Sequence, residues 1–194
     1  MAVTLLGACA LDAPGGDPTE TTAPVHCVST PTGAPTCYGT FTEAIAAATH
    51  GDIADAPADP GDLANDAEFA ARIEQHDARA ILAAPTTNPG STVIDASVVI
   101  GIVYKDSNYH GDSWVFTESA GCDGNPISVD YYVNNLNASP YSDYGFNDSI
   151  SSFLSFASCT TTLYNDWWGG GASYTAVNAP GVLYNDAASS IYWE

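Results

Sequence analysis

One six-residue pattern occurs twice in the C-terminal half of the chain, as Asn-Asp-x-x-Ser-Ser at 147–152 and again at 185–190. Each copy is followed by a strand-like aromatic run, at 153–156 and 191–193. A repeated motif indicates a domain built from two similar units.

Each copy also gathers oxygen atoms from carboxylate, amide and hydroxyl groups, to which the backbone can add a carbonyl. Mixed oxygen sets suit hard cations such as calcium. The absence of soft ligands disfavours a transition metal. The alternative, that these are ordinary turn and edge residues, is less favoured because the pattern repeats.

A hairpin signature precedes each copy of the pattern. The first, Tyr-x4-Tyr-x-Gly, begins at Tyr104. In the second, which begins at Tyr164, we match the second aromatic and the glycine to Trp168 and Gly170, one residue early. The first unit also contains an insertion, which holds Cys122 and a Tyr/Asn-rich stretch at 130–144. From residue 92 onward, short β-type runs broken by Gly, Asn, Asp and Pro predict an antiparallel β-sandwich or barrel.

These motifs resemble those of the βγ-crystallin family, specifically its microbial calcium-binding members, over about residues 97–194. The resemblance implies a mainly β fold in which two Greek keys pack as a wedge-shaped sandwich and share two calcium sites. It implies that each site takes a carbonyl and a hydroxyl from one clamp (one copy of the six-residue pattern) and a carboxylate from the other. One site would then use Ser149, Ser151 and Asp186, and the other Ala187, Ser189 and Asp148. Each would add a hairpin carbonyl, from Lys105 or Asn165, with the pairing of carbonyl to site left open.

The N-terminal half has a helical pattern. Thr40 and Glu43 form a capping box that predicts a helix over Phe41–Thr49, and apolar periodicity predicts a second helix over Asp62–Ala83. Pro85 and the Asn-Pro-Gly sequence at 88–90 predict a break. We therefore expect a signal remnant and linker at 1–25, a small helical region at 26–85 and the β-sandwich at 92–194. We also expect the sandwich to fold without the helical region.

The five cysteines indicate an exported protein with structural disulfides. Local pairing predicts bridges Cys27–Cys37 and Cys122–Cys159. Cys9 follows a short apolar start, which is typical of a lipidated bacterial signal or of a truncated signal whose cysteine has no role. The N-terminal half also resembles a segment of exported actinobacterial proteins, which again implies an extracellular or cell-surface location.

The charge balance excludes two classes of partner. Three Lys and Arg against 23 Asp and Glu give a net charge of −20, and three cations cannot neutralise a phosphate track or hold an anionic membrane surface. No stretch is long and apolar enough to span a membrane.

Nothing in the sequence predicts catalysis. The four histidines are scattered and match no recognised ligand spacing, and no nucleophile elbow is present. Trp167 and Trp168 could line a carbohydrate surface, but packing in the core or hairpin is the favoured interpretation.

We therefore expect an exported, calcium-binding, non-enzymatic module with a calcium-stabilised structural or binding role. The alternative is a secreted protease inhibitor, because some secreted actinobacterial inhibitors have a crystallin-like fold. An inhibitor needs a rigid exposed loop, and the insertion in the first unit is the candidate. The expected partners are calcium ions and an extracellular protein or protease.

Overall fold

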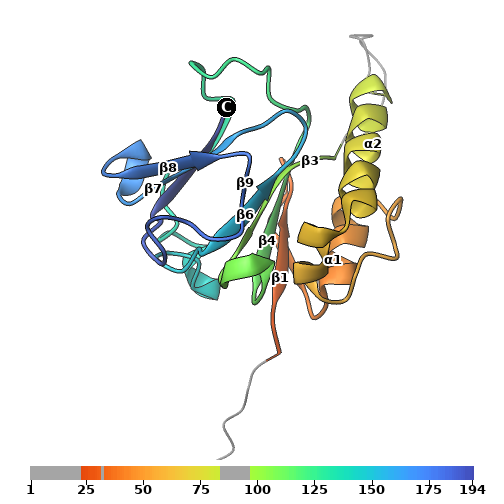
Figure 1. Ribbon diagram of the computed structural model, residues 1–194, viewed down its shortest axis with the longest axis horizontal. Coiled ribbons are helices and arrows are strands. Elements are labelled where there is room, and N and C mark those ends of the chain that lie inside the picture. Colours follow the sequence, from red (N-terminus) through yellow and green to blue (C-terminus); the bar gives the residue numbers. More distant parts are fainter. Residues whose placement is uncertain (1–22, 32, 84–96) are drawn as a thin grey trace, which may run out of the picture.

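The computed structural model describes residues 23–31, 33–83 and 97–194 (Figure 1). Cys9, most of the expected linker and the expected break at 85–90 lie outside these residues. The described chain contains two β-sheets and two α-helices, with α1 and α2 on one side of the molecule.

Two Greek keys make up the β half, and they exchange strands. The strands of the first are β3 (Val98–Tyr104), β4 (Ser113–Glu118), β5 (Tyr131–Val133) and β6 (Ser152–Ser155). Those of the second are β7 (Thr161–Tyr164), β8 (Ser173–Ala176), β9 (Asn178–Ala179) and β10 (Ser190–Trp193). The sheets run β2-β1-β4-β3-β6-β9 and β5-β10-β7-β8, so the third strand of each Greek key joins the sheet of the other. This confirms the predicted two-Greek-key, βγ-crystallin-like sandwich with a small helical segment before it.

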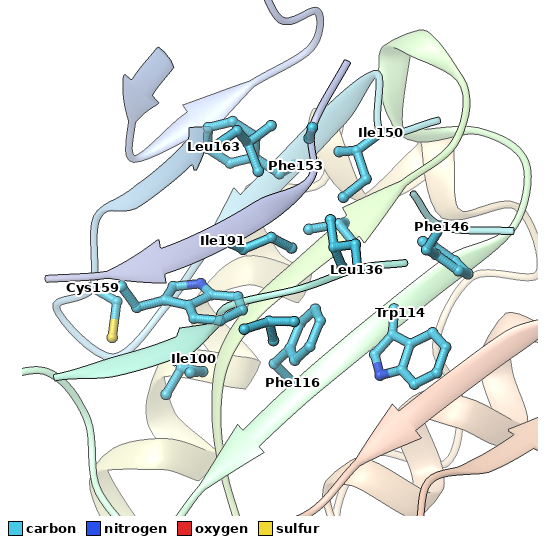
Figure 2. Packing of buried hydrophobic residues seen from close by; sticks show 14 of the residues in the cluster. Ile100, Trp114, Phe116, Leu136, Phe146, Ile150, Phe153, Cys159, Leu163 and Ile191 are labelled. Carbon is cyan, nitrogen blue, oxygen red and sulfur yellow. The ribbon is translucent and has the colours of Figure 1, made fainter. Parts of the chain in front are cut away.

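The main core lies between the two sheets (Figure 2). Trp114 and Trp193 are fully buried there, and their rings contact Phe146 and Phe116 with centroids 5.2 and 4.7 Å apart. Burial of side chains this large is the dominant stabilising contribution in such a sandwich.

The N-terminal region extends and covers the first sheet. Strand β1 (His26–Ser29) pairs with β4 in parallel and with β2 (Thr36–Tyr38) in antiparallel fashion, a hairpin that the helical pattern of this region did not predict. Helices α1 (Phe41–Ala48) and α2 (Ala67–Ala83) pack on the outer face of the sheet. Apolar residues of the two parts share one buried cluster, which includes Phe41, Ile45, Phe69, Ile73, Val99, Ile102, Val115 and Leu154.

The helix predictions were right in one case and wrong at one boundary. Helix α1 begins after Thr40, whose hydroxyl accepts the Glu43 N–H as the capping box requires. The second helix does not begin at Asp62. A 3₁₀ helix occupies Pro60–Asn65, and the Asp66 carboxylate then accepts the N–H groups of Glu68 and Phe69. Such an N-cap starts a new helix, so α2 begins at Ala67.

Both predicted disulfides are present. Cys27–Cys37 joins β1 to β2, and Cys122–Cys159 ties the insertion to the loop after β6. None of the helices in the described ranges is long and apolar enough to cross a bilayer.

Candidate metal centre

Each clamp turns sharply at its second residue. Asp148 and Asp186 have φ values of 52° and 55°, in the left-handed region where Asp is better tolerated than most residues. The preceding asparagine orients each carboxylate: Asn147 Nδ2 donates to Asp148 Oδ2 at 2.6 Å, and Asn185 Nδ2 donates to Asp186 Oδ2 at 2.7 Å. The carboxylates are therefore held in place by their own clamps.

The fold brings the hydroxyl of each clamp to the carboxylate of the other. Ser151 Oγ donates to Asp186 Oδ1 at 3.0 Å, and Ser189 Oγ donates to Asp148 Oδ1 at 3.2 Å. We call Ser149, Ser151 and Asp186 site A, and Ala187, Ser189 and Asp148 site B. In both sites the hydroxyl and carboxylate meet in the combination that the family resemblance implies, although the two residues lie far apart in the sequence.

The sequence did not predict which hairpin carbonyl belongs to which site. In the structure, each hairpin lies next to one clamp. The Ser151 N–H donates to the Tyr104 carbonyl at 2.9 Å, and the Ser189 N–H donates to the Tyr164 carbonyl at 2.8 Å. Lys105, which follows Tyr104, therefore lies beside site A. Asn165 lies beside site B, and it also lines the same hollow of about 640 Å³ as two members of that site.

The donor atoms of both sites fit a hard cation. Each site offers one carboxylate, one hydroxyl and backbone carbonyls, which is the mixed oxygen set that calcium accepts. Within the described residues, the carbonyls of the four positions concerned accept no hydrogen bond from a backbone N–H; these positions are 105, 149, 165 and 187. Asn147 Oδ1, beside Asp148, is buried and has no hydrogen-bond partner among the described atoms. Across the same residues, no cluster of three or more His, Cys, Asp or Glu side chains is present.

The side chain of Lys105 does not occupy site A. Its ammonium donates to Asp112 Oδ2 at 2.7 Å and to the Tyr144 carbonyl, and it lies 5.0 Å from the Phe146 ring centroid. The Asp112 carboxylate neutralises this charge. Only the backbone carbonyl of Lys105 is thus left for a ligand role.

The alignment of the second hairpin by its aromatic residue was wrong. Asp106 N–H donates to the His110 carbonyl at 3.1 Å, and Asp166 N–H donates to the Gly170 carbonyl at the same distance. Gly111 and Gly171 have matching φ values of +76° and +75°. The counterpart of Gly111 is therefore Gly171.

This alignment places Gly169, not Trp168, at the position of Tyr109. The Tyr192 ring fills the space that a side chain at Gly169 would take, since a Cβ there would lie 2.9 Å from it. Counting seven residues from the first tyrosine of each hairpin finds the right glycine. Requiring an aromatic residue before that glycine does not.

Comparison with known proteins gives structural matches alone. No protein-family model matches the chain, and no curated protein sequence matches it. Among solved structures, a βγ-crystallin domain from Flavobacterium johnsoniae is 30% identical and aligns over 49% of this chain and 93% of that domain, with a TM-score of 0.34. A βγ-crystallin from Ciona intestinalis is 22% identical over 48% of this chain and 98% of its own, with a TM-score of 0.35. A structure described as "Evolution of the eye lens beta-gamma-crystallin domain fold" is 21% identical over 57% and 92%, with a TM-score of 0.37.

Proposed function

Starting from a chain whose β half has a βγ-crystallin-like fold, we propose that it is an exported calcium-binding module with a calcium-stabilised structural or binding role and no catalytic activity. The observation that carries this proposal is the reciprocal contact between the clamps, in which Ser151 meets Asp186 and Ser189 meets Asp148. Site A would hold one ion with the Ser149 and Lys105 carbonyls in addition. Site B would hold the other with those of Ala187 and Asn165.

Calcium would link the two Greek keys at these sites. The carboxylate at each site comes from one Greek key and the hydroxyl from the other, and Ser151 and Ser189 are buried. An ion that bridges such groups binds the folded state in preference to the unfolded chain, and it therefore stabilises the fold. With one carboxylate per site, we expect dissociation constants of roughly 10⁻⁶ to 10⁻³ M.

Isothermal titration calorimetry with calcium tests the proposal. The unmodified protein should bind two ions. Asp186→Asn should remove site A, Asp148→Asn should remove site B, and the double variant should bind none. Asp62→Asn is the matched control, because it removes the same charge from an exposed position outside the clamps. No heat of binding in the unmodified protein would contradict the proposal.

We propose export because the protein contains two disulfides. Cys27–Cys37 and Cys122–Cys159 belong to an oxidising compartment, since cytosolic thiols are kept reduced. Whether Cys9 carries a lipid is decided by mass spectrometry of the protein recovered from its producing cells.

One feature of the insertion favours the alternative of a protease inhibitor. Ile127 is 92% exposed at the tip of a loop, and the adjacent Ser128 N–H donates to the Asn125 carbonyl at 3.1 Å. The Cys122–Cys159 bridge anchors the same loop. A rigid loop that presents an apolar side chain suits the specificity pocket of a protease. Titration against a panel of secreted serine proteases tests this function, and Ile127→Asp should abolish any inhibition that is found.

A further inference from the structure

The hollow beside site B is framed by two exposed indole rings. Trp167 and Trp168 are 51% and 72% exposed, whereas Trp114 and Trp193 are fully buried in the core. Packing of Trp167 and Trp168 in the core is therefore wrong, and any packing within the hairpin leaves about half or more of each side chain exposed. Both side chains line the 640 Å³ hollow.

The backbone at Trp168 is in a conformation that does not suit tryptophan. Its φ is 60° and ψ is 34°, in the left-handed region that bulky residues rarely adopt. The first hairpin has the same conformation at the equivalent position, but the residue there is Asn108, which tolerates it better. Strained residues of this kind are concentrated at functional sites. Trp168 thus adds strain and an exposed apolar surface, and neither stabilises the fold.

The conformation of Trp168 is held by its surroundings. The Trp168 N–H donates to the Asn134 carbonyl at 2.9 Å, and the Gly169 N–H donates to Ser190 Oγ at 3.1 Å. The ring is therefore carried on a fixed backbone, which lowers the entropy lost when a ligand binds.

The rest of the hollow is polar and rich in amides. Its other lining residues carry groups that donate to or accept from hydroxyls, and they are Asn137, Asn147, Asp148, Asn165, Asp166 and Ser189. A flat apolar ring next to paired hydrogen-bonding groups matches a pyranose ring, which has apolar C–H faces and hydroxyls at its edge. Asp148 and Asp166, in a chain of net charge −20, repel anionic sugars.

We propose that this hollow binds a neutral oligosaccharide, with the indoles of Trp167 and Trp168 against the sugar face and the Asn side chains on its hydroxyls. This goes beyond the proposed calcium binding but shares two residues with it, because Asp148 and Ser189 belong to both the hollow and site B. Calcium would fix the positions of these two side chains.

The repeat itself supplies the matched variants. Trp168→Asn and Trp167→Ser install the residues that the first hairpin carries at the equivalent positions, Asn108 and Ser107. Trp168→Asn should keep or raise the melting temperature, because it relieves the strained backbone, while it weakens sugar binding about tenfold or more, as removal of an aromatic hot spot does. Leu183→Ala is the control, since Leu183 is 72% exposed and lies outside the hollow.

The measurement is titration with cellotetraose, xylotetraose, mannotetraose, laminaritetraose and N-acetylchitotetraose, followed by calorimetry and by tryptophan fluorescence, with tetragalacturonate as the anionic control. All four tryptophans lie in the described residues, and of these Trp167 and Trp168 are exposed while Trp114 and Trp193 are fully buried. Protection from quenching by acrylamide therefore reports on Trp167 and Trp168. We expect at least one neutral tetrasaccharide to bind and the anionic one not to bind. Binding to none of the five overturns the proposal, as does undiminished binding by both tryptophan variants or unfolding of both.

Each titration is run with calcium and with chelator. Loss of sugar binding in chelator shows that the two sites are coupled, and equal binding in chelator shows that the sugar site stands without calcium. Calcium heats without any sugar binding would remove this inference and leave the proposed function intact.

Discussion

The two Greek keys have the same backbone arrangement, but they differ in what covers them. Strand β1 extends the first sheet at β4, helices α1 and α2 cover the outer face of this sheet, and strand β3 is buried along its whole length. The β7–β8 hairpin of the second Greek key lies at the end of the molecule away from these helices (Figure 1), and the two residues at its turn expose indole rings.

The same hairpin backbone can therefore bury an aromatic side chain in the core or expose aromatic side chains at its turn. Tyr109 and Gly169 occupy equivalent positions with φ values of 66° and 70°, but Tyr109 is buried against Tyr104. In the covered hairpin the aromatic residue completes a core. In the uncovered hairpin, aromatic residues are displaced to the turn, where they form a surface.

Removal of the N-terminal region should have the largest effect on this comparison. The sequence predicts that the sandwich folds alone. The packing favours the opposite result, because a chain that begins at Ser91 would expose a continuous apolar face formed by Val99, Ile102, Val115, Leu154 and Phe156. We now expect the shortened chain to aggregate or to lose its cooperative thermal transition even with calcium. A soluble chain with a sharp melting transition would show that the first Greek key does not need its cover.

A single substitution gives a graded version of this test. Phe41 is fully buried under the first sheet, and Phe41→Ala should lower the free energy of unfolding by about 3–5 kcal/mol. Leu82→Ala on α2 is the control, because Leu82 is 86% exposed.

Asp77 should make the covered side sensitive to pH. It lies on α2, is 1% exposed, and accepts the Val99 N–H at 2.9 Å, while its Oδ2 has no partner among the described atoms. Burial raises the pKa of Asp77 to about 7, with a smaller increase from Glu74, against the lowering effect of the Val99 N–H. The ordinary value is 3.8, so between these limits the folded state holds a proton that the unfolded chain releases.

The free energy of unfolding should therefore fall as pH rises from about 4 to about 7 and level off above, by up to about 4 kcal/mol for a shift of about three units. Asp77→Asn removes this dependence, so it should gain stability relative to the unmodified protein at pH 8 and gain little at pH 4. Urea unfolding at a series of pH values measures the difference, with Asp62→Asn as control. Parallel pH profiles for Asp77→Asn and the unmodified protein would contradict it.

The two calcium sites should stabilise the fold to a similar extent. Beside site A, Lys105 and Asp112 form an ion pair, and the equivalent positions beside site B hold the neutral residues Asn165 and Ala172. The net charge of each pair is therefore zero. At a free calcium concentration about 100-fold above the dissociation constant, each site should add roughly 2.7 kcal/mol. Thermal melting with calcium and with chelator measures this, and the shift should halve in either Asp148→Asn or Asp186→Asn. A melting temperature that calcium leaves unchanged would show that the clamps are turn structures and not calcium sites.

The smallest expected effect concerns the glycine that distinguishes the second hairpin. Gly169→Ala places a Cβ 2.9 Å from the Tyr192 ring at a φ of +70°, which should lower stability by roughly 1–2 kcal/mol. Gly181→Ala is the control, since open space surrounds Gly181. Equal unfolding free energies for the two variants would show that the Tyr192 ring moves aside without a loss of stability.

Much of the fold could be predicted from local patterns. Thr40 and Glu43 placed the start of α1, and the spacing of the cysteines predicted both disulfides. The start of α2 was missed because Asp62 and Asp66 are both acceptable caps, and only the hydrogen bonds of the Asp66 carboxylate distinguish them.

For the candidate site, the repeated motif placed the clamp residues, and the family resemblance suggested how they combine. The sequence by itself determined the two-fold repeat, the oxygen chemistry of the clamps and the N-cap of α1, because these depend on residues a few positions apart. Only the tertiary structure decided which hairpin carbonyl lies beside which clamp, that β1 pairs with β4, and that Trp167 and Trp168 face solvent. These features depend on contacts between distant segments, whose relative positions are set by burial of apolar area over the whole fold and not by any local rule.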